Sequence, residues 1–403
     1  MIEQFLNTEL GPIQTIEAYS KFAHRLMFSE EIIVRRVVEK LKNNVEDWAV
    51  NKSLVYKNHD GVKTYNRKDL LNKDDWYVEE LKEQSQNFST SGSTTGDPFS
   101  YSIWSKYISH IEDDHQYGMI LDEFDISRKD ISILVLMKLP YNPKIEEFGV
   151  EQNGDSDFTM HTHKSISSKR YFVNFNDYIE NPDVWHKKLF EFIENKSFDV
   201  IISTGPSINT LCFYLKKFNY TNKLCKLLSH TGEFLIKQDA YYLKENEYID
   251  NFCDHMRCWD GGATFFTCKF GTYHLMDNLS WVEEGENNKM ISTDYFSLPA
   301  PFIRYWNGDL CKISDDYQRC DCGRLYRSFK MLENRPFGLK GTTKLTSIKQ
   351  QVSKLGFKQD IVQVKFDNLK VDIVVKRELS DIEKEQLNNI FNEYEINYSN
   401  YGS

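Results

Sequence analysis

Positions 89–96 form the stretch of the chain best suited to binding phosphate. They contain only serine, threonine and glycine, so unshielded backbone N–H groups and hydroxyls can donate to phosphate oxygens. The triphosphatase P-loop also requires a lysine after its second glycine, and this run has none. The alternative is a flexible Ser/Thr/Gly linker, which composition alone does not exclude. The candidate phosphate-binding residues are Ser91, Gly92, Ser93, Thr94, Thr95 and Gly96.

A second group of residues has the composition of a zinc site. Cys268-x5-His274 is followed about fifty residues later by Cys320-x-Cys322, which together offer three thiols and an imidazole. Four protein ligands leave no open position, so the expected role of Zn²⁺ is structural, and a zinc redox or hydrolytic enzyme is disfavoured. The alternative for Cys268 and His274 is ordinary packing, but closely spaced cysteines in a reducing compartment usually bind metal or do redox chemistry.

The remaining thiols and one histidine pair are expected to have no catalytic role. No base stands beside Cys212, Cys225, Cys253, Cys258 or Cys311, so these five are expected to be packing residues. The pair His161-x-His163 has no third ligand nearby and is interpreted as a surface feature.

The elements that must position these groups alternate along the central part of the chain. Apolar periodicity predicts helices in 13–48, 74–86 and about 103–121, then a buried strand at 131–139. Helix, strand, helix and strand follow at 184–194, 199–203, 207–218 and 223–229, an order typical of α/β proteins. Positions 265–313 have short segments and many turn signals, which predict antiparallel strands around a binding cleft.

The last seventy residues are predicted to form a small α+β lobe. A helix is expected at 347–355, strands at 361–366 and 371–375, and a second helix from Ser380, where Glu383 completes a capping box. Pro336, Gly338 and Gly341 interrupt the pattern. The predicted domains are therefore residues 1–334, with a helical part at about 1–86, and residues 335–403.

Composition excludes several classes of protein. The chain has 403 residues, of which 40% are hydrophobic and 14% aromatic, which predicts a globular protein with a large core. A net charge of −10 disfavours binding to nucleic acid or to an anionic membrane. The longest apolar run, 131–137 with one serine in it, is far below the roughly 20 residues of a membrane helix, and no signal peptide is visible. We expect a soluble cytoplasmic protein.

Several motifs, in the same order, resemble those of adenylate-forming ligases, in the branch that contains phenylacetate-CoA ligases and their capsule-synthesis relatives. Positions 90–98 resemble the signature Thr-Ser-Gly-Ser-Thr-Gly-x-Pro with one extra threonine, and Thr231-Gly232-Glu233 resembles the Gly-Glu adenine contact. Positions 301–309, Pro-Phe-Ile-Arg-Tyr-Trp-Asn-Gly-Asp, resemble the segment Pro-x-Ile-Arg-Tyr-Arg-Thr-Gly-Asp. Taken singly, Gly232 and Asp309 would also suit ordinary turns. The four Cys/His positions resemble a zinc site found in part of this branch.

The resemblance implies a fold and roles for individual residues. The expected fold is α/β, with a large N-terminal adenylate-forming domain of mixed sheets and flanking helices and a small α+β C-terminal lobe. Residues 91–96 would hold phosphates of ATP, Gly232 and Glu233 would lie at adenine, Asp309 and Arg335 would bind the ribose, and Asp260 would bind Mg²⁺.

This sequence departs from the family pattern at three places. Met256 and Asp260 stand where the family has the tyrosine and glutamate of Tyr-Gly-x-x-Glu. Pro336-Phe337-Gly338 replaces the acidic pair after the hinge arginine, which weakens support for a hinge rotation. The C-terminal Gly-Lys motif is missing, and Lys340 and Lys344 are the candidates for its catalytic lysine.

The predicted function is that of an ATP-dependent acid ligase. It would activate a small carboxylic acid, aromatic by preference, as an acyl-AMP and transfer the acyl group to CoA or to an amine, as relatives of indoleacetate-lysine synthetase do. The alternative is a degenerate, non-catalytic nucleotide-binding protein of the same fold. A homodimer is one of the assemblies left open.

Overall fold

A computed structural model describes residues 1–89, 100–104, 117–137, 159–160, 168–174, 182–231, 237–258, 261–332, 355–357, 361–367, 370–375, 377–391 and 395–400. The predicted helix at 347–355 and the pair His161 and His163 fall almost entirely outside these ranges. The predicted domain boundary at 334/335 also lies outside them.

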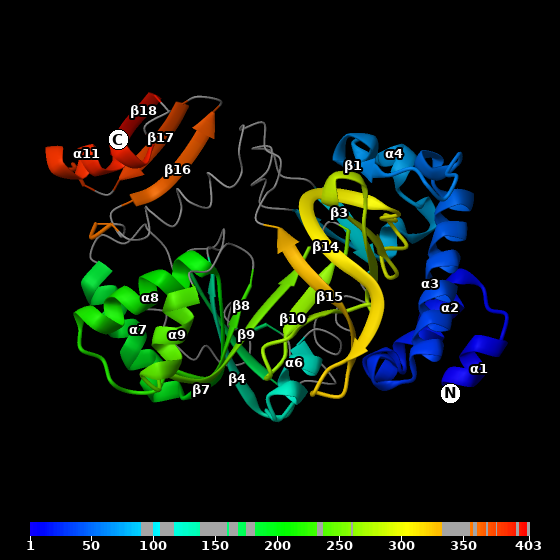
Figure 1. The fold of residues 1–403 in the computed structure, drawn as a ribbon, viewed down its shortest axis with the longest axis horizontal. Helices are drawn as coiled ribbons and strands as arrows, with labels where there is room; N and C mark the ends of the chain where they lie inside the picture. Colours follow the sequence, from blue (N-terminus) through cyan, green and yellow to red (C-terminus); the bar gives the residue numbers. More distant parts are fainter. Residues whose placement is uncertain are drawn as a thin grey trace.

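The N-terminal part is a helical layer along one side of the molecule (Figure 1). It contains α1 (Ile2–Asn7), α2 (Pro12–Ser20), the 3-10 helix η1 (Ala23–Phe28) and α3 (Glu31–Lys52). In α3 the residues Val34, Val38, Leu41 and Val45 recur at three and four positions and are buried. This periodicity places one apolar stripe against the core. The predicted helical region at 13–48 is confirmed, with a break at η1.

The predicted helix at 74–86 is wrong. The chain forms only α4 (Lys73–Trp76) and the 3-10 helix η4 (Glu79–Gln84) before β2 (Ser85–Ser89) begins. The indole of Trp76 donates to Pro301 O at 2.7 Å, and Val78 N donates to Pro299 O at 2.9 Å. These long-range hydrogen bonds draw the backbone away from the helix that the periodicity favours.

The predicted helix at 103–121 is also wrong over its first residues. β3 (Ser100–Trp104) pairs antiparallel with β2, and helical structure is described only in α6 (Gly118–Glu123). Residues 105–116 lie outside the described ranges. The short elements between the helical layer and the sheets are η2 (Leu54–Tyr56), β1 (Tyr65–Asn66) and η3 (Arg67–Leu70).

An eight-stranded mixed sheet forms the centre of the molecule. Its order is β11-β10-β9-β8-β7-β4-β6-β5. The five middle strands are parallel: β4 (Ile131–Met137), β6 (Ser168–Asn174), β7 (Phe198–Ser203), β8 (Cys225–His230) and β9 (Ile249–Arg257). The outer strands are antiparallel: β5 (Thr159–Met160), β10 (Thr264–Thr267) and β11 (Tyr273–Leu275). The predicted buried strand at 131–139 is confirmed as β4.

Both faces of this sheet are buried, as the continuous apolar runs of its strands predict. Leu134 and Leu136 belong to one core cluster with residues of α7 (Pro182–Lys196), α8 (Gly205–Lys217) and α9 (Lys237–Glu245). Ile133 and Val135 belong to a second cluster that reaches the N-terminal helices. The predicted helix–strand alternation at 184–229 is confirmed, and the three helices lie together beside the sheet in Figure 1.

A second, five-stranded sheet carries part of the candidate site. Strands β12 (Ser280–Glu284), β13 (Lys289–Asp294), β14 (Tyr305–Arg319) and β15 (Leu325–Leu332) are antiparallel, and β1 joins β14 in parallel. The 3-10 helix η7 (Glu286–Asn288) lies between β12 and β13. The prediction of antiparallel strands over 265–313 is confirmed.

The C-terminal elements form a small α+β unit. β16 (Ile361–Asp367), β17 (Lys370–Val375) and β18 (Glu395–Asn400) make a three-stranded sheet, with α11 (Asp381–Ile390) before the last strand. Val371, Ile373, Leu387 and Phe391 belong to a separate hydrophobic cluster. The predicted capping box at Ser380 and Glu383 is confirmed, whereas β18, which pairs parallel with β17, was not predicted.

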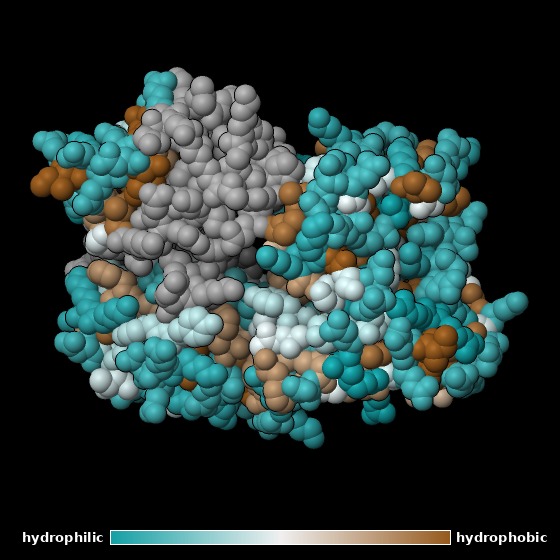
Figure 2. All heavy atoms as spheres, in the orientation of Figure 1, coloured by the Kyte–Doolittle hydropathy of each residue, from teal (hydrophilic) through white to brown (hydrophobic). Residues whose placement is uncertain are grey.

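The surface shown in Figure 2 is largely hydrophilic, with apolar side chains scattered over it. Among the described helices, none has the length and apolarity needed to cross a lipid bilayer.

Candidate functional site

The structure brings together the four residues predicted to bind zinc. The ligand atoms of Cys268, His274, Cys320 and Cys322 all lie within 4.8 Å of one another. The sulfur of Cys268 is 3.8 Å from that of Cys320, and the sulfur of Cys322 is 3.5 Å from His274 Nε2. We call these four residues the metal cluster. Three are buried and Cys322 is half-buried.

Two similar turns present the thiols. In the turn after β10, the Cys268 carbonyl accepts from Gly271 N at 2.8 Å. In the turn between β14 and β15, the Cys320 carbonyl accepts from Gly323 N, also at 2.8 Å. The φ angles of Gly271 and Gly323 are 78° and 86°, a left-handed conformation that favours glycine. Each turn therefore closes by the same backbone geometry and directs its cysteine inward.

The distances in the metal cluster fit a tetrahedral ion. Zn–S bonds of about 2.3 Å and Zn–N bonds of about 2.0–2.1 Å place tetrahedral sulfurs about 3.8 Å apart and sulfur and nitrogen about 3.6 Å apart. The two measured contacts, 3.8 and 3.5 Å, agree with these values. The ring of His274 stacks on Phe266 with centroids 5.4 Å apart, which holds Nε2 toward the sulfurs. The donor set therefore suits zinc in kind and in spacing.

The thiols of the metal cluster influence one another. A hydrogen bond with Cys322 lowers the pKa of Cys268, and the same hydrogen bond raises the pKa of Cys322. Cys268 is thus the sulfur in this pair that loses its proton first, and a thiolate is the form that binds metal.

Asp309, the expected ribose ligand, lies on β14 and is only 5% exposed. Its Oδ2 accepts from Asn307 Nδ2 at 3.0 Å, and its backbone N–H donates to Asn307 Oδ1 at 2.9 Å. The indole of Trp306 donates to the Asp309 carbonyl at 2.9 Å. Gly308 between them has a φ of 102°, which permits this tight loop. The carboxylate is therefore held in a fixed orientation.

The other expected site residues fall outside the described ranges. These are Ser91, Gly92, Ser93, Thr94, Thr95, Gly96, Gly232, Glu233, Asp260, Arg335, Lys340 and Lys344. Thr231, which precedes Gly232, is described, and its N–H donates to Ser203 O at 2.9 Å. Thr231, the first residue of the segment expected to contact adenine, therefore lies where β7 and β8 end together.

A polar network at this edge of the sheet was not anticipated from the sequence. His230 Nδ1 lies 2.7 Å from Asp254 Oδ1, and the Tyr273 hydroxyl donates to the other oxygen of Asp254. Ser229 Oγ lies 2.6 Å from His255 Nδ1. Ligands of α/β folds bind outside the carboxyl ends of parallel strands, where this network lies. His230 and Asp254 are direct partners in the β8–β9 register, but β9 was not among the predicted strands, so no sequence signal pointed to this pair.

Burial and hydrogen bonding set the charges in the network. Burial lowers the pKa of His255 to about 4, so its imidazole is neutral at pH 7. Burial raises the pKa of Asp254, but hydrogen bonds from His230 and Tyr273 outweigh this effect and bring it below its usual value. The network therefore contains the carboxylate of Asp254 and, on the neighbouring residue, the neutral imidazole of His255.

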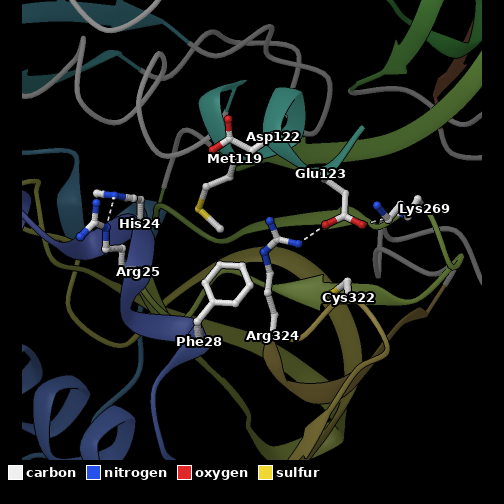
Figure 3. A pocket seen from close by; sticks show the side chains of 9 residues that line it. All are labelled: His24, Arg25, Phe28, Met119, Asp122, Glu123, Lys269, Cys322 and Arg324. Carbon is white, nitrogen blue, oxygen red and sulfur yellow. Dashed lines mark hydrogen bonds and ion pairs between the residues drawn. The ribbon is translucent and has the colours of Figure 1, made fainter. Parts of the chain in front are cut away.

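A cavity of about 230 Å³ adjoins the metal cluster (Figure 3). Phe28 and Met119 form apolar parts of its wall, and Cys322 reaches it from the cluster. Glu123 and Arg324, which also line it, form an ion pair whose side chains are 3% and 5% exposed. The five other cysteines, Cys212, Cys225, Cys253, Cys258 and Cys311, are buried, as expected of packing residues.

Comparison with known proteins relates the chain to one fold. No family model and no curated protein matches the sequence. A crystal structure of 2-hydroxyisobutyryl-CoA ligase in the postadenylation state, in complex with R3-HIB-AMP, aligns with a TM-score of 0.61 and 10% identity, over 94% of this chain and 88% of that one. The same ligase with 2-HIB-AMP and CoA, in the thioesterification state, aligns with a TM-score of 0.60 and 12% identity, over 94% and 89%. An open conformation gives a TM-score of 0.58 and 10% identity, over 94% and 90%. At such low sequence identity, these alignments show the fold alone. The chain has the α/β fold seen in this adenylate-forming ligase.

Proposed function

We propose that the protein is an ATP-dependent ligase that activates a carboxylic acid as an acyl-AMP with release of pyrophosphate. It then transfers the acyl group to CoA or to an amine. The observation that carries this proposal is the shared fold over 94% of the chain with a CoA ligase whose structures contain acyl-AMP molecules, with CoA in two of them. The family motifs found in order along the sequence support it independently.

The chemistry explains why such a fold is needed. A carboxylate is a poor acyl donor because its oxide leaving group is strongly basic. In the proposed first step, one carboxylate oxygen attacks the α-phosphorus of ATP, and pyrophosphate leaves. In the second step, a thiol or amine attacks the acyl carbon, and AMP leaves with the transferred oxygen. Catalysis consists mainly of aligning the reactants and neutralising phosphate charge.

The proposed roles of the site residues follow the family resemblance. Residues 91–96 hold phosphate oxygens, Gly232 and Glu233 contact adenine, and Asp309 and Arg335 bind the ribose hydroxyls. Lys340 and Lys344 are the candidates for the lysine that stabilises charge on the reacting groups. The buried, hydrogen-bonded carboxylate of Asp309 supports its role, since a ribose ligand must be held in one orientation before the nucleotide binds.

Two metal ions belong to the proposal. Mg²⁺ on Asp260 would neutralise phosphate charge. Zn²⁺ held by Cys268, His274, Cys320 and Cys322 would cross-link the turn after β10 to the turn between β14 and β15. The match between the cluster's distances and tetrahedral geometry supports zinc. With four protein ligands, the role is structural.

The proposed substrate is an aromatic or other small acid, as in the phenylacetate-CoA ligase branch. The segment 259–266 is rich in aromatic residues, and Phe265 and Phe266 are buried. Gly261 and Gly262 have φ angles of 99° and 78°, a left-handed backbone conformation that favours glycine. In the proposed domain organisation, residues 1–334 bind ATP and the acid, and residues 335–403 form a smaller lobe. The separate hydrophobic cluster of the C-terminal elements supports this division.

Acid-dependent release of pyrophosphate from ATP, measured across a panel of carboxylic acids, tests the proposal. We expect release with at least one small acid and a loss of about 10²-fold or more in Asp309→Ala. Asp316→Ala changes an exposed aspartate on the same strand and should retain activity. Trapping with hydroxylamine, followed by CoA or amino acids as acceptors, then identifies the acceptor class. Measurable ATP binding without pyrophosphate release across the panel would favour the non-catalytic binding protein instead.

A further inference from the structure

Glu123 contacts both turns that carry the metal cluster, although it belongs to a third element, α6. One carboxylate oxygen accepts from Lys269 N at 3.1 Å, directly after Cys268. The other accepts from the guanidinium of Arg324, two positions after Cys322. Figure 3 shows both interactions at the wall of the cavity. Glu123 is thus a bridge between two segments that lie about fifty residues apart in sequence.

The bridge is buried and packed against aromatic rings. The side chains of Glu123 and Arg324 are 3% and 5% exposed, so the carboxylate depends on its two donors in place of water. The guanidinium of Arg324 lies 4.8 Å from the ring centre of Phe28 and 5.4 Å from that of Phe266. Phe266 in turn stacks on His274. Through Arg324, the carboxylate therefore also fixes the ring against which the imidazole ligand lies.

We propose that Glu123 is a positioning residue for the metal cluster. Its carboxylate holds the Cys268 turn and the Cys320–Cys322 turn at the separation that a tetrahedral ion requires. The reason is geometric: each turn closes on its own hydrogen bonds, and Glu123 joins the two by hydrogen bonds to both. Groups that orient metal ligands typically contribute 10–100-fold to metal affinity. This inference rests on the zinc site of the proposed function, and it does not depend on the reaction.

The cavity makes a sharp test feasible. Glutamine has nearly the same shape as glutamate, and the space of about 230 Å³ beside the side chain allows it to fit without a clash. Glu123→Gln replaces a charged acceptor by an amide, which can keep one of the two contacts. The adjacent Asp122 lines the same cavity but pairs with Arg128, whose Nε donates to it at 2.8 Å, on the exposed side of α6. Asp122→Asn is therefore the matched control.

The experiment measures zinc affinity by competition with a chromogenic chelator. We expect Glu123→Gln to weaken zinc binding by about 10–100-fold, and Asp122→Asn to leave it within threefold of the wild type. The visible spectrum of the Co²⁺-substituted protein provides a second readout, because it reports ligand geometry, which a loss of overall stability does not change. We expect an altered spectrum for Glu123→Gln alone.

Glu123→Asp covers the case in which the glutamine variant fails to fold. It keeps the negative charge opposite Arg324 but is one methylene too short to reach both turns, so we expect an intermediate loss of zinc affinity. Zinc affinity and cobalt spectra equal to the wild type in both folded variants would overturn the role of Glu123 and leave the zinc site intact. A wild type that binds no zinc would overturn both the role of Glu123 and the zinc site itself. This conclusion would not depend on whether the protein releases pyrophosphate.

Discussion

The sulfur of Cys268 lies 3.8 Å from the sulfur of Cys320, which stands 52 positions further along the chain. The two cysteines occupy equivalent places in two turns, each closed by a hydrogen bond from a glycine three residues later. Backbone geometry in two separate sheets therefore positions the two sulfurs. The other two residues of the metal cluster, His274 and Cys322, complete a set of the size and kind that zinc prefers.

Zinc content is the first prediction. Protein purified without added metal should contain one zinc per chain, and Cys320→Ser/Cys322→Ser should contain none, because two of four ligands are lost. Metal analysis by mass spectrometry checks this. Cys212→Ala, which changes a buried cysteine on α8, should retain full zinc content. A wild type without stoichiometric metal would contradict the assignment.

Two glycines with the same φ angle should differ in their tolerance of a side chain. Gly61 and Gly262 have φ angles of 79° and 78°, but a Cβ at Gly61 meets nothing within 4 Å. A Cβ at Gly262 would lie 2.7 Å from Cβ of Asp294. Gly61→Ala should cost about 1 kcal/mol through backbone strain. Gly262→Ala should cost about 1–3 kcal/mol more because of overpacking, as measured by urea unfolding. Equal losses of stability in the two variants would contradict this prediction, because they would mean that residues 261–262 shift to make room for the added Cβ.

The ion pair between Arg327 and Asp277 should contribute far more to stability than a surface pair. Both side chains are 0% exposed, and Tyr317 donates to the same carboxylate at 2.9 Å. Arg327→Met leaves a buried carboxylate without its cation and should cost about 3–5 kcal/mol in the free energy of unfolding. Lys217→Met, which breaks an exposed pair with Asp183, should cost less than about 1 kcal/mol. Similar losses in the free energy of unfolding for the two variants would contradict a large contribution from the buried ion pair.

His255 should make stability depend on pH in the acidic range. Burial lowers its pKa to about 4, below the usual value near 6.5, so the unfolded chain binds its proton more readily than the folded one. The stabilising effect of the neutral ring is present above pH 6.5 and is lost as the pH falls toward 4. Between pH 7 and pH 5, the wild type should lose about 2 kcal/mol relative to His255→Gln. Urea unfolding of both proteins at each pH checks this, and parallel pH profiles would refute it.

Local patterns predicted much of the α/β core. The apolar run at 131–137 indicated a strand buried on both faces, and β4 contributes to a different core cluster on each side. Ser380 and Glu383 marked the start of α11 because a capping box is satisfied within a few residues. The spacing of Cys268, His274, Cys320 and Cys322 likewise indicated one site, and the structure brings these four together.

Features that depend on distant partners were not predictable in this way. The helix expected at 74–86 is replaced because Trp76 and Val78 bond to carbonyls near position 300. Glu123 gives no signal in its own segment, since its partners lie after position 268. The pairing of His230 with Asp254 required knowledge that β8 and β9 are neighbours in register.

The fate of one oxygen atom tests the proposed reaction most directly. The protein is incubated with ATP, its acceptor and an acid labelled with ¹⁸O in the carboxylate, and the products are examined by mass spectrometry. If the carboxylate attacks the α-phosphorus, one ¹⁸O appears in AMP, and pyrophosphate contains none. Label in inorganic phosphate, or AMP without label while product forms, would contradict activation through an acyl-AMP.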